Sequence, residues 1–189
     1  MMEAMPADAM GGMDAGMMEA CPCGAMQGMD APMMEAMPAD AMGGMDAPMM
    51  ANMPPDAMGG FSAEQMEAMP PDAMPGMDAD MMAACPPDAM GGMDTAMVDA
   101  IPVEAMGGFG SDQMAAIPVE AMGGFGSEQM EALSPEAMPG IGADQMGAMD
   151  SSAIEAMEST DGGIGAMDAA LGGDMAAAPV VDVNPADAA

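Results

Sequence analysis

The sequence predicts a mainly α-helical, solenoid-like stack of very short helices, and three observations carry this prediction. From Met5 to Ala156 the chain divides into 19 octads without one insertion or deletion. The first residue of every octad is apolar, and the sixth is Met in all octads but two. Pro and Gly recur along the whole stretch, which excludes one continuous helix. A register held this long indicates a repeated local structure.

Two octad types mostly alternate, so the sequence unit is sixteen residues. One type has the form of residues 53–60 (MPPDAMGG), and the other has the form of residues 61–68 (FSAEQMEA). In the first type, Pro at position two suits the first helical turn, the acid at position four lies near the positive helix N-terminus, and the Gly pair ends the turn. In the second type, Ser62 and Gln65 have the spacing of a capping box.

Positions one and six of each octad are the predicted core. Their spacing of five and then three residues places them on one helical face. Helices this short are unstable alone, so neighbouring repeats must supply the burial. We expect the chain to fold back every eight residues and to stack every sixteen. The alternative is a largely disordered or irregular chain, because a core of Met and Ala specifies packing poorly.

The repeat defines the domain organisation. Residues 1–156 form the octapeptide-repeat region, 157–178 a degenerate cap or fraying repeat, and 179–189 an extended tail or linker. There is no run of about 18 apolar residues, so no transmembrane segment is expected.

The composition excludes most kinds of enzyme and partner. The chain contains no Lys, Arg or His, so it offers no fixed cation and no catalytic base other than carboxylates. We therefore expect no catalytic residues, no cofactor-binding residues and no small-molecule substrate. A net charge of −32 excludes nucleic acid as a direct partner, because phosphate binding needs Lys or Arg.

The acids at position four are candidate calcium ligands. In a stack they would form like-charged rows, and bound Ca2+ between the rows would relieve the repulsion at weak, multiple sites. The candidates are Asp56, Asp72, Asp88, Glu104 and Glu120. The competing interpretation is a solvated acidic face that serves helix N-termini and solubility.

A Cys-x-Cys pair flanked by methionines is a candidate copper site. Thiolate and thioether ligands are soft and select Cu(I), and the candidates are Met18, Cys21, Cys23 and Met26. The competing interpretation is structural: Cys21 and Cys85 both stand at position one, where every residue is apolar.

Residues 61–68, 109–116 and 125–132 resemble the Thr-x-x-Gln-Val/Ile-x-Ala-Leu octads of large secreted or surface proteins of bacteria, often described as adhesin-like. The resemblance implies a spacer, stalk or assembly role outside the cell or at its surface, with no catalytic residues to carry over. We therefore expect a methionine-rich structural repeat protein that acts as scaffold, spacer or filament component, by self-association or within a larger assembly. The alternatives are a Cu(I)-binding protein and an acidic accessory subunit ordered within a larger complex.

Overall fold

The computed structural model describes residues 7–159, and within this range each octad forms one short helix and no strand occurs. The predicted mainly α stack of short helices is confirmed. Residues 157–159 belong to the last helix; the rest of the predicted cap, the predicted tail and residues 1–6 lie outside the described residues. Among the described helices none is both long and apolar enough to cross a membrane.

The α-helices have four to nine residues. They are α1 (Ala15–Glu19), α2 (Ala31–Glu35), α3 (Ala39–Met42), α4 (Ala47–Ala51), α5 (Pro55–Met58), α6 (Ala63–Ala68), α7 (Ala79–Ala84), α8 (Pro87–Met90), α9 (Thr95–Ala100), α10 (Ser111–Ala116), α11 (Ser127–Ala132), α12 (Ala143–Ala148) and α13 (Ser151–Ser159). The 3-10 helices are η2 (Ala7–Gly12), η3 (Cys23–Gly28), η4 (Pro71–Gly76), η5 (Val103–Gly108), η6 (Val119–Gly124) and η7 (Met138–Gly140).

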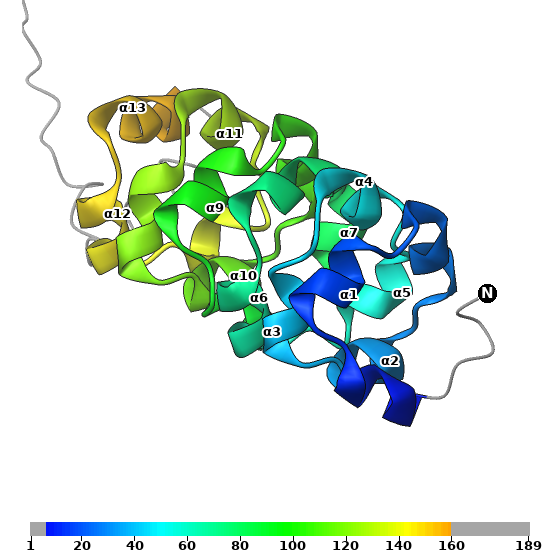
Figure 1. Ribbon diagram of the computed structural model, residues 1–189. Helices are drawn as coiled ribbons and strands as arrows, with labels where there is room; N and C mark the ends of the chain where they lie inside the picture. Colours follow the sequence, from blue (N-terminus) through cyan, green and yellow to red (C-terminus); the bar gives the residue numbers. More distant parts are fainter. Residues whose placement is uncertain (1–6, 160–189) are drawn as a thin grey trace, which may run out of the picture.

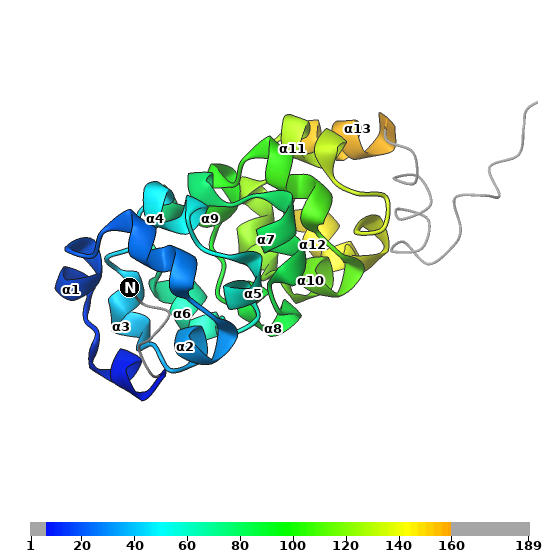
Figure 2. The ribbon, with the colours of Figure 1, turned by 90° about the vertical axis from the view of Figure 1, so that its right-hand side faces the viewer.

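The helices stack in three rows, and the chain visits each row once in every three octads. Helices that pack closely on one another are always three octads apart. The rows are η2–α2–α5–α7–η5–α11–α13, then α1–α3–α6–α8–α10–η7, and then η3–α4–η4–α9–η6–α12. The result is an elongated, three-sided solenoid that advances steadily along its axis, as the order of colours in Figures 1 and 2 shows.

The coil therefore closes after three octads, or 24 residues, and not after the two octads expected from the sequence. The sixteen-residue unit survives as the alternation of two octad types, which we call Gly-ended and Ala-ended after their eighth residue (Asn52 replaces Ala once). Because three is odd, a helix of one type packs on helices of the other type. The exception is α13, which packs on α11 although both come from Ala-ended octads.

The core is a continuous column of methionines enclosed by the three rows. From Met26 to Met149 positions one and six are buried as predicted, and Met10, Met18 and Met26 have no exposed surface in the first coil, where Met13 and Cys21 are partly buried. Side chains from different rows meet in this column: the rings of Phe109 and Phe125 make an edge contact with centroids 6.4 Å apart. A fully buried Met contributes about 1.5–3 kcal/mol, so stability rests on many similar contributions along the axis.

Position five is a third core position that the periodicity did not indicate. It is Ala in the Gly-ended octads and Met or Gln in the Ala-ended octads, as in Ala73 and Met81, except in the last octad, which has Ala153. Both kinds of residue are buried from Met33 on. Because octad types alternate along each row, a small side chain follows a large one at this level of the core, which lets successive coils interdigitate.

The glycine at position eight has a packing role beyond the predicted one of ending the turn. The helix ends at position seven, where Gly43 and Gly59 are right-handed caps. A β-carbon at position eight would overlap the carbonyl oxygen of position three in the preceding coil. The pairs are Gly44–Ala15, Gly60–Ala31, Gly76–Ala47, Gly92–Ala63, Gly108–Ala79, Gly124–Thr95 and Gly140–Ser111. The Gly-ended octads therefore end in Gly because two backbones touch there.

The helix starts follow three patterns. Where position two is Asp and position five is Met, the carboxylate accepts a hydrogen bond from the backbone N–H of position five, as in Asp78 to Met81 at 2.8 Å. In the Ala-ended octads where position two is Ser or Gly, a Gln at position five reaches back and accepts from the N–H of position two. The capping box of Ser62 and Gln65 is confirmed. In the Gly-ended octads with Pro at position two, the proline is the N-cap residue itself, as at Pro102, and not a residue of the first turn as predicted.

Candidate functional site

The surface carries shallow hollows that recur with the repeat. Three of the four that we compare lie where a Gly-ended octad gives way to an Ala-ended one. The largest of the four, of about 460 Å³, is lined by residues that include Cys85, Gly108, Phe109, Gln113 and Glu136. Two further hollows are lined at equivalent positions, around Gly60 and Gly44. A hollow that recurs in this way follows from the construction of the solenoid and is not a unique site.

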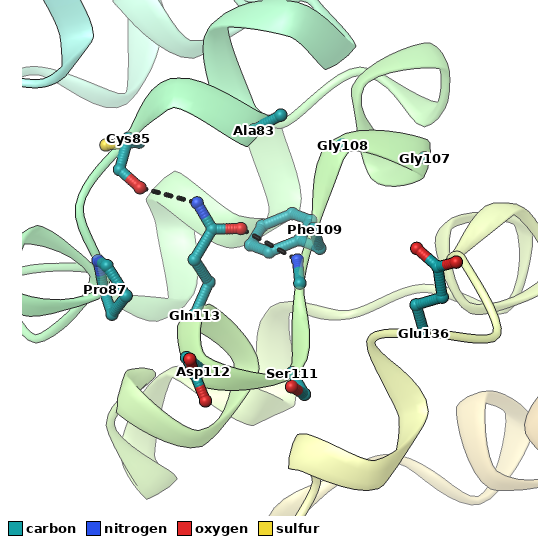
Figure 3. A pocket seen from close by; sticks show the side chains of 11 residues that line it. Ala83, Cys85, Pro87, Gly107, Gly108, Phe109, Ser111, Asp112, Gln113 and Glu136 are labelled. Atoms are coloured by element: carbon teal, nitrogen blue, oxygen red, sulfur yellow. Dashed lines mark hydrogen bonds between the residues drawn. The ribbon is translucent and has the colours of Figure 1, made fainter.

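The polar groups at the floor of the largest hollow are already engaged (Figure 3). Gln113 Oε1 accepts from the backbone N–H of Gly110 at 2.8 Å. Its Nε2 donates to the carbonyl oxygens of Met82 and Cys85, both at 2.7 Å. The carboxylates of Asp112 and Glu136 at the rim are exposed, and they can attract a hydrated cation.

The same buried amide recurs along the rod. Gln65, Gln129 and Gln145 make the equivalent pair of bonds to carbonyl oxygens 31 and 28 residues earlier. Every buried side-chain nitrogen or oxygen of the described residues has a partner. Sequence reasoning found the capping bond of Gln65 but missed its second role as a clamp between coils. A signal was present, because Gln occupies position five only where position two is Ser or Gly.

The five predicted calcium ligands are exposed, and each stands in the first turn of the helix in its own Gly-ended octad. The three-octad coil distributes them over all three rows, whereas the two-octad stack would have aligned them. Asp56 and Glu104 share one row, Asp72 and Glu120 another, and Asp88 lies in the third. Within residues 7–159 no group of three or more carboxylate, thiol or imidazole side chains stands close enough to hold a metal ion.

The four predicted copper ligands lie together in the chain at the N-terminal coil, but only the two thiols are accessible. Met18 and Met26 are fully buried in the core column. Cys21 and Cys23 are half-buried, pack against that column and are free thiols. Cys85 is a core residue, as its position-one register indicated, and burial raises its pKa to about 12. It is therefore a protonated, unreactive thiol near neutral pH.

The fold and these surfaces define a class of protein: a three-sided helical solenoid with an apolar core and an acidic exterior, built from octads. Comparison of the sequence with protein-family models and with curated proteins finds no match.

Proposed function

We propose that this chain is a structural and interaction repeat, a rigid spacer or scaffold held in solution by its charge. The observation that carries the proposal is the uninterrupted core column, which runs from Met10 to Met157 without a break into separate domains. Each coil adds the same increment of length and buries the coil before it. Such an architecture sets a distance between two ends and repeats one lateral surface along that distance.

The distribution of charge supports the same function. The chain has 32 acidic and no basic side chains, and the acids of the described residues are on the exterior. This charge opposes collapse and non-specific association, and it also destabilises the compact state by self-repulsion. A cation-rich environment, such as the outside of a cell, would reduce that repulsion. The resemblance to octads of secreted and surface proteins supports the same location.

The proposal is tested with the full chain by circular dichroism and small-angle X-ray scattering in NaCl and in CaCl2 at matched ionic strength. We expect a helical, elongated particle whose thermal stability rises with ionic strength, because screening weakens repulsion between the exposed acids. Equal effects of the two salts would indicate screening alone, whereas an excess effect of CaCl2 would support weak calcium sites between the rows. A coil spectrum in every salt would refute the proposed function.

The accessory-subunit alternative predicts that the chain forms a complex with a basic partner. Its support is the one-sided charge, since within residues 7–159 the exposed carboxylates face no Lys, Arg or His. Native purification with attached neighbours tests it. A partner that leaves the chain at high salt favours this alternative, because an electrostatic contact weakens as the Debye length shortens.

The copper alternative now depends on the half-buried thiols of Cys21 and Cys23, because the two neighbouring thioethers are enclosed in the core. Anaerobic Cu(I) titration against a competing chelator measures the affinity of the full chain. If Cys21→Ser with Cys23→Ser leaves that affinity unchanged, the clustered site does not exist. Cys85→Met is the matched control, because it removes the one remaining thiol from the core.

A further inference from the structure

The methionines divide the rod into two parts with different cores. Residues 29–100 comprise nine octads with 19 methionines, whereas residues 101–148 comprise six octads with six methionines. In the first part most octads have Met at position one, and most Ala-ended octads have it at position five as well, as Met45 and Met49 show. In the second part position one is Ile, Phe or Leu, and position five is Ala or Gln. All of these methionines are buried, so thioether side chains dominate only the first core.

The buried amide clamps follow the same division. In the second part, Gln113, Gln129 and Gln145 each donate two hydrogen bonds from position five to carbonyl oxygens of earlier coils. Within the first part Gln65 alone does so. The other Ala-ended octads there have a methionine at this position: Met33, Met49, Met81 and Met97. Fewer octads of the first part are thus clamped to the coil before them, and local opening costs less free energy there.

The thioether sulfurs are nucleophiles, and a peroxide can oxidise them. The sulfur forms a bond to one peroxide oxygen, the O–O bond breaks, and water leaves, so the sulfur is oxidised by two electrons and the peroxide is reduced. The sulfoxide makes an apolar side chain polar and adds a hydrogen-bond acceptor. Every buried side-chain nitrogen or oxygen of the described residues already has a partner. A sulfoxide at a core position would therefore be buried without a side-chain donor, at a cost that favours opening of its coil.

The stacking of the coils lets such damage spread along the axis. Each coil of a solenoid is covered by its neighbours, so the opening of one coil exposes the core side chains of the next. In residues 29–100 the newly exposed side chains are again methionines at two or three levels of the core. Beyond Ile101 only position six still has a thioether, and the amide clamps become frequent. Both features oppose further spreading at the same place in the chain.

We propose that the methionines at positions one and five of residues 29–100 are oxidation sites that make this part of the rod a redox-sensitive segment. Its co-reactant is a two-electron oxygen donor of the peroxide class. Residues 101–148 keep their fold at oxidant doses that open the first part. The inference goes beyond the scaffold function, because it gives the condition under which half of the scaffold is lost, and it rests on that function only in requiring the folded solenoid.

Titration of the full chain with hydrogen peroxide tests the proposal. Circular dichroism measures the helix that remains, and hydrogen exchange with mass spectrometry shows which part has lost amide protection. A protease that cleaves at Asp and Glu locates the sulfoxides, since the chain has no Lys or Arg for trypsin. Treatment with dithiothreitol before each measurement reduces disulfides and leaves sulfoxides in place. We expect sulfoxides and lost protection in residues 29–100, while residues 101–148 stay protected.

Two matched variants exchange the same two side chains between the parts. Met37→Ile with Met53→Ile gives two octads of the first part the Ile-Pro start of residues 101–108, and should lower the sensitivity of residues 29–100 to peroxide. Ile101→Met with Ile117→Met places two thioethers at position one of the second part, and should extend the loss of protection into it. Both variants should fold, because the chain itself uses Met and Ile at this position.

Equal loss of protection in the two parts at every peroxide dose would overturn the division of the rod. Sulfoxides throughout residues 29–100 with an unchanged helix signal, or native methionines that resist peroxide until the whole chain unfolds, would overturn the redox-sensitive segment. Each of these results leaves the proposed function standing. A coil spectrum before any peroxide is added would instead overturn the proposed function itself.

Discussion

Gly108 in η5 lies directly against the carbonyl oxygen of Ala79 at the start of α7, one coil earlier, and this backbone contact sets the spacing of the two coils. The hydrogen that replaces a side chain at Gly108 points toward that oxygen, a geometry typical of weak Cα–H to oxygen bonds. The neighbouring Gly107 has no atom within 4 Å of its own β-carbon position. Of these two adjacent glycines, only Gly108 is required by the close packing of two coils.

Gly108→Ala should destabilise the protein by about 1–3 kcal/mol, because its methyl group would force two coils apart. Gly107→Ala should be neutral or stabilising by up to about 1 kcal/mol, because it reduces the freedom of the unfolded chain without a clash. Chemical denaturation followed by circular dichroism measures both changes. Equal stabilities for the two variants would show that the close approach at Gly108 is absent.

The contrast between these glycines shows what the sequence could and could not predict. Octad periodicity identified positions one and six as core, and Ser62 and Gln65 as a capping box. It could not give the number of octads in a coil, since eight-residue periodicity is compatible with a return after two, three or more. That number depends on which side chains and backbones fit across the stack.

Gln113 stabilises both its own helix and the contact with the previous coil, so its replacement should have two separable consequences. Gln113→Met removes the cap at Gly110 and the bonds to two buried carbonyl oxygens. We expect a loss of about 2–3 kcal/mol, since buried acceptors are left without donors. Adding Gly110→Asp recreates the Asp-and-Met start seen at Asp78 and Met81, and should restore about 1 kcal/mol through the new cap.

Denaturation midpoints of Gln113→Met, the double variant and the parent form the test. Recovery in the double variant separates the capping role from the inter-coil role. If Gln113→Met already matches the parent, then the amide contributes no net stability, and the clamp between coils is unimportant energetically.

Cys85 should make the protein less stable at high pH. Its pKa is raised to about 12 by burial, whereas an unfolded thiol titrates near 8.5. Between these values the unfolded chain has lost the proton that the folded chain keeps, so stability falls as pH rises, by up to about 1.4 kcal/mol per pH unit. The chain has no Lys or Tyr to titrate in the same window.

Cys85→Met is the matched control, because it turns residues 85–92 into a copy of residues 53–60, where Met53 fills the same core position. Stability profiles of the two proteins should diverge above about pH 9. A thiol reagent at pH 8 should label Cys21 and Cys23 in the native protein and Cys85 only after unfolding. Rapid native labelling of all three thiols would contradict the burial of Cys85.

The alternation of octad types predicts that the solenoid tolerates the loss of two octads better than the loss of a complete coil. Residues 101–116 and 117–132 are near copies, so deletion of 101–116 rejoins an Ala-ended to a Gly-ended octad. Every stacked pair across the new junction still combines the two types. Deletion of 101–124 removes one full coil of three octads. Octads of the same type then stack on each other across the new junction.

In that second variant, alanine methyl groups would meet the position-three carbonyl oxygens that now face glycine, as Gly108 faces Ala79. With two such contacts, made by Ala132 and Ala148, we expect a cost of about twice the roughly 1–3 kcal/mol of a single overpacked site, and a less cooperative transition. α11 and α13 already form a stacked pair from two Ala-ended octads. They avoid this clash because the α13 helix continues beyond position eight, to Ser159. Thermal unfolding and small-angle X-ray scattering of both deletion variants test this prediction. If the deletion of 101–124 gave a stable, shortened rod and the deletion of 101–116 an unstable one, then stacking of unlike octad types would not be required.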